Sequence, residues 1–281
     1  MTLTGELAPR ADDYGHRAVL LDWDREFLPW VRGKKRSATV EGMRLPLPPP
    51  WKPGQHWALI GPTGMGKSTF GVGVTGLRRW VVSLDGKGGD STLATSGYVR
   101  IRAVPPPRGR PVGRPQPGTD RWVWDRVDKG LPVGLVVGFE ALTDDEDEEL
   151  RALMREAIAW CRRTKGWTLY VDEFELLSSQ RMMRVGAQIE RMLITARDAG
   201  VSVVTSFQAP AWVSKHATRQ ATLCTMWPTG DRDMIMNVAR SMGRDWRVLA
   251  AVNDELPAFH SVTIPKDIRA PLLITTAPKR S

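Results

Sequence analysis

The nine residues 61–69 read Gly-Pro-Thr-Gly-Met-Gly-Lys-Ser-Thr and directly follow a short apolar run at 56–60. The glycines allow the backbone to curl, so that several N–H groups can point at one phosphate chain. In this pattern Lys67 reaches the terminal phosphates of a nucleotide, and the hydroxyl of Ser68 binds Mg²⁺. The stretch therefore predicts a site for ATP and Mg²⁺. Its members are Gly61, Pro62, Thr63, Gly64, Met65, Gly66, Lys67, Ser68 and Thr69.

Two consecutive carboxylates, Asp172 and Glu173, follow a second apolar run at 167–171. At the end of a strand, Asp172 is expected to hold Mg²⁺ through water, opposite Ser68, and Glu173 to activate the attacking water. A second carboxylate directly after the first favours a hydrolase over a kinase. We therefore expect an ATPase that converts ATP and water to ADP and phosphate, with Lys67 and Glu173 as catalytic residues.

Further along the chain, a polar amide and an arginine stand at positions where they could complete such a site. Gln208 ends an apolar run and could sense the terminal phosphate by hydrogen bonding, although an ordinary strand end is an equal alternative. Arg197 follows a helical pattern and could act on a nucleotide, or could simply be a cation matched to the helix dipole.

The order of apolar runs and helical patterns predicts the elements that must position these residues. Short apolar runs alternate with helices, which is typical of an α/β fold: a RecA-like P-loop NTPase with a mainly parallel central sheet flanked by helices. We expect helices at 144–163, capped by Thr143, and at 182–199, stopped by Gly200. The helix after the phosphate loop should be short, because it is rich in glycine and β-branched residues. The predicted strands are 56–60, 80–84, 99–104, 134–139, 168–171, 201–206, 221–227, 261–264 and 272–275.

The prolines divide the chain into regions. Residues 1–50 read as an N-terminal arm that ends in a Pro-rich linker, and 51–281 read as one P-loop ATPase domain. Trp23, Phe27 and Trp30 recur at helical spacing in the arm, which is more typical of packing than of a docking surface. Residues 105–119 are rich in proline and arginine and should form a loop within the ATPase domain. Trp122 and Trp124 after it alternate, as at a strand or core edge.

Composition narrows the class of protein. The chain has 281 residues, a net charge of +9 and a pI of about 9.9, so it attracts polyanions, although a solvated basic surface explains the charge equally well. It lacks an apolar stretch long enough to span a membrane and a signal-peptide core, and it has two cysteines, which fit a reducing compartment. We expect a cytoplasmic protein without a disulfide framework or a zinc site.

Over residues 55–230 the order of motifs resembles the FtsK/HerA superfamily of DNA-pumping ATPases. The phosphate loop is followed by Asp-Gly-Lys-Gly-Gly at 85–89, where the family often has proline in place of Gly86, then by the two acids and by Arg-x-x-Gly-Val with Phe-Gln-Ala-Pro. The resemblance implies a soluble motor core in a homo-oligomeric, hexameric ring. It also implies that Arg197 is an arginine finger acting on a neighbour's ATP and that Gln208 is the sensor. Arg181, Arg184 and Arg191 are rival fingers.

The resemblance further implies DNA as a partner, held by its phosphate backbone without sequence specificity, and DNA-stimulated hydrolysis. Viral or mobile-element DNA packaging or transfer would suit a motor core, with a loading or portal-like protein as a second partner. Two other functions stay open, an ATP-dependent switch or scaffold with little turnover and a small-molecule phosphotransferase. The candidate DNA contacts, each of which could instead be a solvated loop residue, are Arg108, Arg110, Arg114, Arg181 and Arg184.

Overall fold

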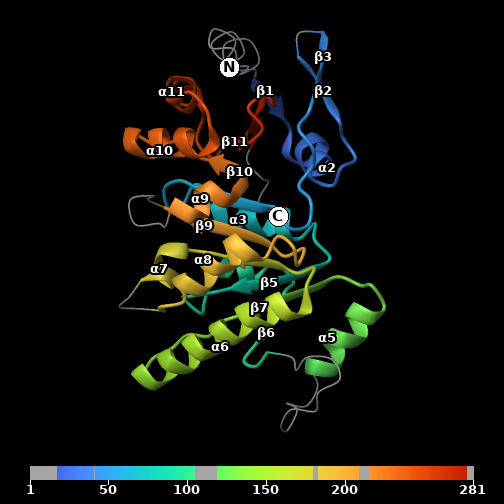
Figure 1. Ribbon diagram of the computed structural model, residues 1–281, viewed down its shortest axis with the longest axis vertical. Coiled ribbons are helices and arrows are strands. Elements are labelled where there is room, and N and C mark those ends of the chain that lie inside the picture. The colour runs from blue at the N-terminus through green and yellow to red at the C-terminus, as the bar shows by residue number, and fades with distance from the viewer. Residues whose placement is uncertain (1–17, 41, 105–118, 180–182, 209–214, 277–281) are drawn as a thin grey trace. The chain divides into compact units, whose positions relative to one another are not determined.

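A computed structural model of the chain describes residues 18–40, 42–104, 119–179, 183–208 and 215–276 (Figure 1). The chain forms two compact units. Unit 1 comprises Met1–Lys52, His56–Phe70 and Phe207–Ser281, whereas unit 2 comprises Pro53–Gln55 and Gly71–Ser206. The predicted division into an arm of residues 1–50 and a domain of residues 51–281 stays a prediction.

The strands of unit 1 begin with β4 (His56–Ile60), which leads into the phosphate loop and pairs in parallel with β10 (Ala221–Met226). Strand β10 pairs antiparallel with β11 (Ser261–Pro265), and β11 pairs antiparallel with β12 (Leu272–Thr275). Strand β1 (Ala18–Leu21) then joins β12 in parallel. The helices α9 (Lys215–Gln220), α10 (Arg232–Met242) and α11 (Trp246–Glu255) complete the C-terminal part of the unit.

The first described residues of unit 1 are built into its core. A π-helical turn, η1 (Trp23–Phe27), continues into α2 (Leu28–Val31), and a hairpin of β2 (Ser37–Val40) and β3 (Met43–Pro46) follows. Trp23, Phe27 and Trp30 lie in these two helical segments, as their spacing predicted. The prediction that they pack in the interior is also confirmed, because each of them is 5% exposed or less. They join one aromatic cluster whose members are Trp23, Phe27, Trp30, Trp51, Trp57, Phe70 and Trp227.

Unit 2 contains five parallel strands in the order β9 (Ser202–Phe207), β8 (Thr168–Val171), β5 (Trp80–Leu84), β7 (Val133–Val137) and β6 (Val99–Ile101), the last residue of β9 belonging to unit 1. Strands β8 and β9 are buried along their whole length, which explains why polar and apolar residues do not strictly alternate in them. Among the described residues of the two units most strand pairs are parallel, and helices accompany the strands in each unit, so the expected α/β fold with mainly parallel strands is confirmed.

Two helices of unit 2 test the expected boundaries. Helix α6 (Asp144–Thr164) has the predicted Thr143 cap, completed by Glu146 into a capping box. Helix α8 (Gly186–Thr195) is shorter than the predicted 182–199: it begins late, because Arg184 adopts a left-handed φ of 51° just before it, and it ends four residues early. Gly200, at φ 66°, lies in a turn beyond the helix rather than directly at its end, so the predicted stop was misplaced.

The remaining helices are α3 (Lys67–Thr75), α4 (Ser91–Ala94), α5 (Thr119–Asp128) and α7 (Phe174–Ser178). Helix α3 follows the phosphate loop and is short, as predicted. The alternating tryptophans lie in α5 and not in a strand, but the core edge expected there is confirmed, because half-buried Trp124 packs on buried Trp160 with 5.8 Å between ring centroids.

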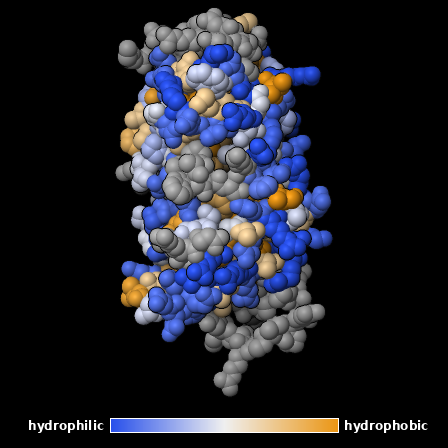
Figure 2. Space-filling model, turned by 60° about the vertical axis from the view of Figure 1, so that its left-hand side comes forward, coloured by the Kyte–Doolittle hydropathy of each residue, from blue (hydrophilic) through white to orange (hydrophobic). Residues whose placement is uncertain are grey.

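Side chains at the surface are mostly polar. On the face drawn in Figure 2, hydrophobic residues lie scattered among hydrophilic ones. Within the described ranges, we find no helix that combines the length and the apolar character needed to cross a membrane.

Candidate nucleotide-binding and hydrolysis site

The phosphate loop lies in unit 1, between the end of β4 and the start of α3. Gly64 and Gly66 have φ values of 79° and 92°, which glycine adopts without the steric cost paid by other residues. The backbone N–H of Phe70 donates to the carbonyl of Gly66 at 2.9 Å and so closes the first turn of the helix. The loop therefore stands between a strand and a helix, as its sequence pattern requires.

Lys67, the first residue of α3, turns its side chain back over the loop. Its residue is 8% exposed, and its Nζ donates to the carbonyl oxygens of Gly61 at 2.7 Å and Pro62 at 2.8 Å. Ser68 and Thr69 follow in the first helical turn. An ammonium, two hydroxyls and a glycine-rich backbone are a donor set that fits a phosphate chain with Mg²⁺.

The aromatic cluster supports the loop from within unit 1. A Cβ atom on Gly61 would lie 2.8 Å from the Cβ of Trp227, so this glycine is needed for close packing. Phe70 contacts Trp57 and Trp227 with ring centroids 5.7 and 5.3 Å away, nearly edge to face. The start of α3 is thus fixed by buried aromatic rings.

Gln208 also belongs to unit 1 and lies beside the phosphate loop. The hydroxyl of Thr63 donates to its Oε1 at 2.7 Å, and the carbonyl of the preceding Phe207 accepts a hydrogen bond from the N–H of Gly61. The structure therefore brings Gln208 to the loop, while its role as a sensor stays a prediction.

The acid pair lies in unit 2, at the end of β8. Asp172 is 5% exposed, and Glu173 caps α7 with a left-handed backbone, at φ 52° and ψ 61°. A non-glycine residue in this region costs about 1–2 kcal/mol, and such strained residues gather at functional sites. The chain thus reverses sharply after the strand. This turn gives the two neighbouring carboxylates different surroundings.

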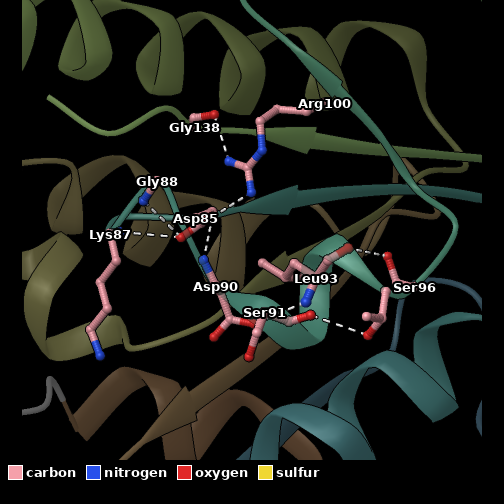
Figure 3. Close-up of polar contacts among 10 residues, drawn as sticks. Asp85, Lys87, Gly88, Asp90, Ser91, Leu93, Ser96, Arg100 and Gly138 are labelled. Atoms are coloured by element: carbon pink, nitrogen blue, oxygen red, sulfur yellow. Dashed lines mark hydrogen bonds and ion pairs between the residues drawn. The ribbon is translucent and has the colours of Figure 1, made fainter. Parts of the chain in front are cut away.

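A second turn of unit 2 follows β5 and contains the Asp-Gly-Lys-Gly-Gly stretch (Figure 3). Asp85 is 3% exposed, and its carboxylate accepts hydrogen bonds from the backbone N–H groups of Lys87, Gly88 and Asp90. The guanidinium of Arg100 also binds this carboxylate, at 2.9 Å. The buried charge therefore has full compensation, and the turn is held by its own aspartate.

Lys87 extends from this turn and binds Glu173. Its Nζ lies 2.5 Å from Oε1 of Glu173, and this hydrogen bond is the main reason why the pKa of Lys87 is raised above its ordinary value. Sequence reasoning noticed the motif but assigned Lys87 no role. No spacing rule links residues 86 positions apart, so only the folded structure reveals the contact.

The candidate fingers and DNA contacts are spread more widely. Arg197 is exposed and lies in the turn after α8, in unit 2, and Arg184 and Arg191 are exposed as well. The finger role of Arg197 stays a prediction. The other basic candidates, Arg108, Arg110, Arg114 and Arg181, lie outside the residues that the structure describes.

Comparison with known proteins supports the fold. No protein-family model matches the chain, and no curated relative matches it in sequence. Its structure is similar to the genome packaging NTPase B204 from Sulfolobus turreted icosahedral virus 2 in complex with sulfate. That likeness has a TM-score of 0.53 at 15% identity and covers 82% of this chain and 100% of that one.

The same viral NTPase in complex with AMPPCP gives a TM-score of 0.52 at 15% identity, over 81% of this chain and 100% of that one. A lower similarity, with a TM-score of 0.49 at 12% identity, joins 91% of this chain to 68% of the pCW3 conjugation coupling protein TcpA. The likeness to the viral NTPase therefore shows that this chain shares its fold.

Proposed function

We propose that this protein is an ATP-hydrolysing motor that binds and translocates DNA. One observation carries the hydrolytic part of this proposal: a complete phosphate loop opens α3 with Lys67 and Ser68, and the consecutive acids Asp172 and Glu173 directly follow a strand of the same chain. A phosphate loop together with a single acid after a strand would suit many nucleotide-binding proteins. The second acid adds a base for water, which a hydrolase needs.

The residues have separate tasks in this mechanism. The loop N–H groups and Lys67 would bind the phosphates, and Ser68 and Asp172 would each serve as a ligand of Mg²⁺. Glu173 accepts a proton from the attacking water, and Gln208 reports the state of the terminal phosphate through its contact with Thr63. Bound ATP with Mg²⁺ supplies the reactive phosphoryl group and neutralises its charge.

The wider function rests on charge and on likeness. A net charge of +9 suits contact with a phosphate backbone, and the similar viral protein is a genome packaging NTPase. We propose a cytoplasmic homo-oligomeric ring, in which Arg197 completes a neighbour's site and basic loops hold DNA. Packaging or transfer of viral or mobile-element DNA, with a loading or portal-like partner, fits such a motor core.

The test is phosphate release from ATP by the purified protein, with and without long double-stranded DNA. Hydrolysis should rise with DNA, and Glu173→Gln should lower the turnover number by about 10²–10⁴-fold while ATP still binds. Glu175→Gln, on the same short helix, is the matched control and should keep its activity.

Other outcomes would point elsewhere. Hydrolysis that is indifferent to DNA would remove the translocase proposal and leave an ATPase. ATP binding without turnover under both conditions would favour a switch or scaffold. Transfer of phosphate to a small acceptor instead of water would favour a phosphotransferase.

A further inference from the structure

The ion pair between Lys87 and Glu173 lies within unit 2 and has no part in the mechanism above. Glu173 is 27% exposed at its side chain, and Lys87 contacts one of its two carboxylate oxygens at 2.5 Å. The exposed part of the pair contributes little stability on its own, because solvent screens such charges. The Lys87–Glu173 contact is therefore better explained by its effect on the position of the Glu173 carboxylate than by a contribution to stability.

The backbone that carries Lys87 is unusually well fixed. Oδ1 of Asp85 accepts the N–H groups of Lys87 at 3.2 Å and Gly88 at 3.0 Å, and Oδ2 accepts that of Asp90 at 3.2 Å. Arg100 donates to Oδ2 at 2.9 Å (Figure 3). Hydrogen bonds to an ionised group are stronger than neutral ones, so four of them on one buried carboxylate hold the turn firmly.

The segment after β7 clamps the same turn from another side. Gly88 has a φ of 75°, and a Cβ atom there would lie 2.1 Å from the carbonyl of Phe139. Arg100, besides binding Asp85, donates to the carbonyl of Gly138 at 2.6 Å. Two neighbouring segments thus meet the turn at close range, and the root of the Lys87 side chain has little freedom to move.

Glu173 needs such a partner because its own backbone is strained. Its left-handed conformation persists only where the surroundings hold it, and the carboxylate ends a flexible side chain. A base must sit within hydrogen-bond reach of the proton that it accepts, so a drifting carboxylate would be a poor one. A fixed cation on one oxygen leaves the other oxygen in a defined place.

We propose that Lys87 is the positioning residue for Glu173. Lys87 holds one carboxylate oxygen so that the other faces the attacking water, and the Asp85–Arg100 pair acts on hydrolysis through Lys87. The inference rests on the proposed ATPase function, and it assigns a task to the turn after β5.

The first experiment compares Lys87→Met, Lys87→Arg and the wild type in steady-state ATP hydrolysis. Lys87→Met should lower kcat by about 10–100-fold, the size expected for a misplaced reacting group, with little change in KM or Tm. Lys87→Arg keeps the cation with a different shape, so it should restore part of the lost rate. Lys35→Met breaks the similar Lys35–Glu26 pair, at 2.8 Å, and should keep the wild-type kcat.

The second experiment asks whether Arg100 works through Lys87. Arg100→Met should lower kcat in the wild-type background and should add little in the Lys87→Met background, because both changes release the same carboxylate. Arg232→Met removes the Arg232–Asp254 pair, at 2.8 Å, and serves as the control. If Arg100→Met lowers Tm strongly, its loss of kcat reflects damage to the fold, and the positioning role is then judged from the Lys87→Met and Lys87→Arg variants.

The outcomes separate this inference from the proposed function. An unchanged or raised kcat in Lys87→Met, in a wild type whose hydrolysis depends on Glu173, overturns the positioning role and leaves the ATPase standing. Equal losses in Lys87→Met and Lys87→Arg together with a lower Tm also overturn it, since the turn would then be merely structural. A wild type that does not hydrolyse ATP overturns both.

Discussion

The hydroxyl of Thr63 and the amide oxygen of Gln208 lie 2.7 Å apart, although the two residues are 145 positions apart in the sequence. Thr63 is the third residue of the phosphate loop, and Gln208 directly follows β9. The contact ties the end of one strand to the loop that opens from another. A change at the loop can therefore reach the chain beyond β9 through a single hydrogen bond.

If Gln208 senses the terminal phosphate, Gln208→Ala should lower kcat by about 10-fold or more, as loss of a polar group aimed at a transition state does. ATP affinity should change little. Thr63→Val, which removes the donor, should change kcat in the same direction by less. Gln220→Ala, at the end of α9, is the control. A Gln208→Ala enzyme with full activity would show that Gln208 is an ordinary strand end.

Arg197 should act between subunits. Arg197→Ala should lower DNA-stimulated hydrolysis by about 10³–10⁵-fold if the arginine is a finger. Mixing this variant with Glu173→Gln should restore part of the activity, because some mixed interfaces then hold an intact Glu173 and an intact neighbouring arginine. The measurement is phosphate release across mixing ratios. Activity lost in Arg191→Ala or Arg184→Ala instead would move the finger to that residue.

Gly71 should be intolerant of alanine although it lies in a helix. A Cβ atom there would lie 2.5 Å from the hydroxyl of Tyr170 on β8. The expected cost is about 1–3 kcal/mol of overpacking, which outweighs the gain of up to about 1 kcal/mol that alanine normally brings to a helix. Thermal unfolding should show a lower Tm for Gly71→Ala. Gly89→Ala, where a Cβ meets nothing within 4 Å, should leave it nearly unchanged.

Cys161 and Cys224 should be inert towards thiol reagents in the native protein. Both are fully buried, and burial raises the pKa of each thiol well above its ordinary value, so the reactive thiolate is rare at neutral pH. A chromogenic disulfide reagent should titrate both thiols in denaturant and neither in buffer. Cys161 lies in unit 2 and Cys224 in unit 1, so single Cys→Ala variants would report the opening of each unit during urea titration. Rapid reaction in buffer would contradict the described burial.

The phosphate loop was predictable because its chemistry is local. Gly64, Gly66, Lys67 and Ser68 lie within five consecutive residues, and the preceding strand is a continuous apolar run. Parallel strands that are buried on both faces are equally easy to predict, and the bounds of the strand at 168–171 were predicted to the residue. Helix α6 was predictable for the same reason, since its cap and its first turn are neighbours in the sequence.

Features that depend on tertiary contact were not predictable. The contact between Lys87 and Glu173 joins two turns of unit 2, and the sequence around neither residue predicts it. Strand β1 was missed because its four residues form a strand only by pairing with β12, more than 250 positions away. The hairpin of β2 and β3 was likewise hidden, in a region that its prolines made look like a linker.

The pairing of β1 with β12 has a consequence for synthesis of the chain on the ribosome. Unit 2 is almost continuous in sequence, so its sheet can form soon after residue 206 has emerged. Unit 1 is assembled from three separate segments, and β1 waits for 272–275, nearly the last described residues. Until these residues have been made, β1 cannot form its native pairing with β12. The phosphate loop therefore belongs to the unit that is completed second of the two, after residues 272–275 have been translated.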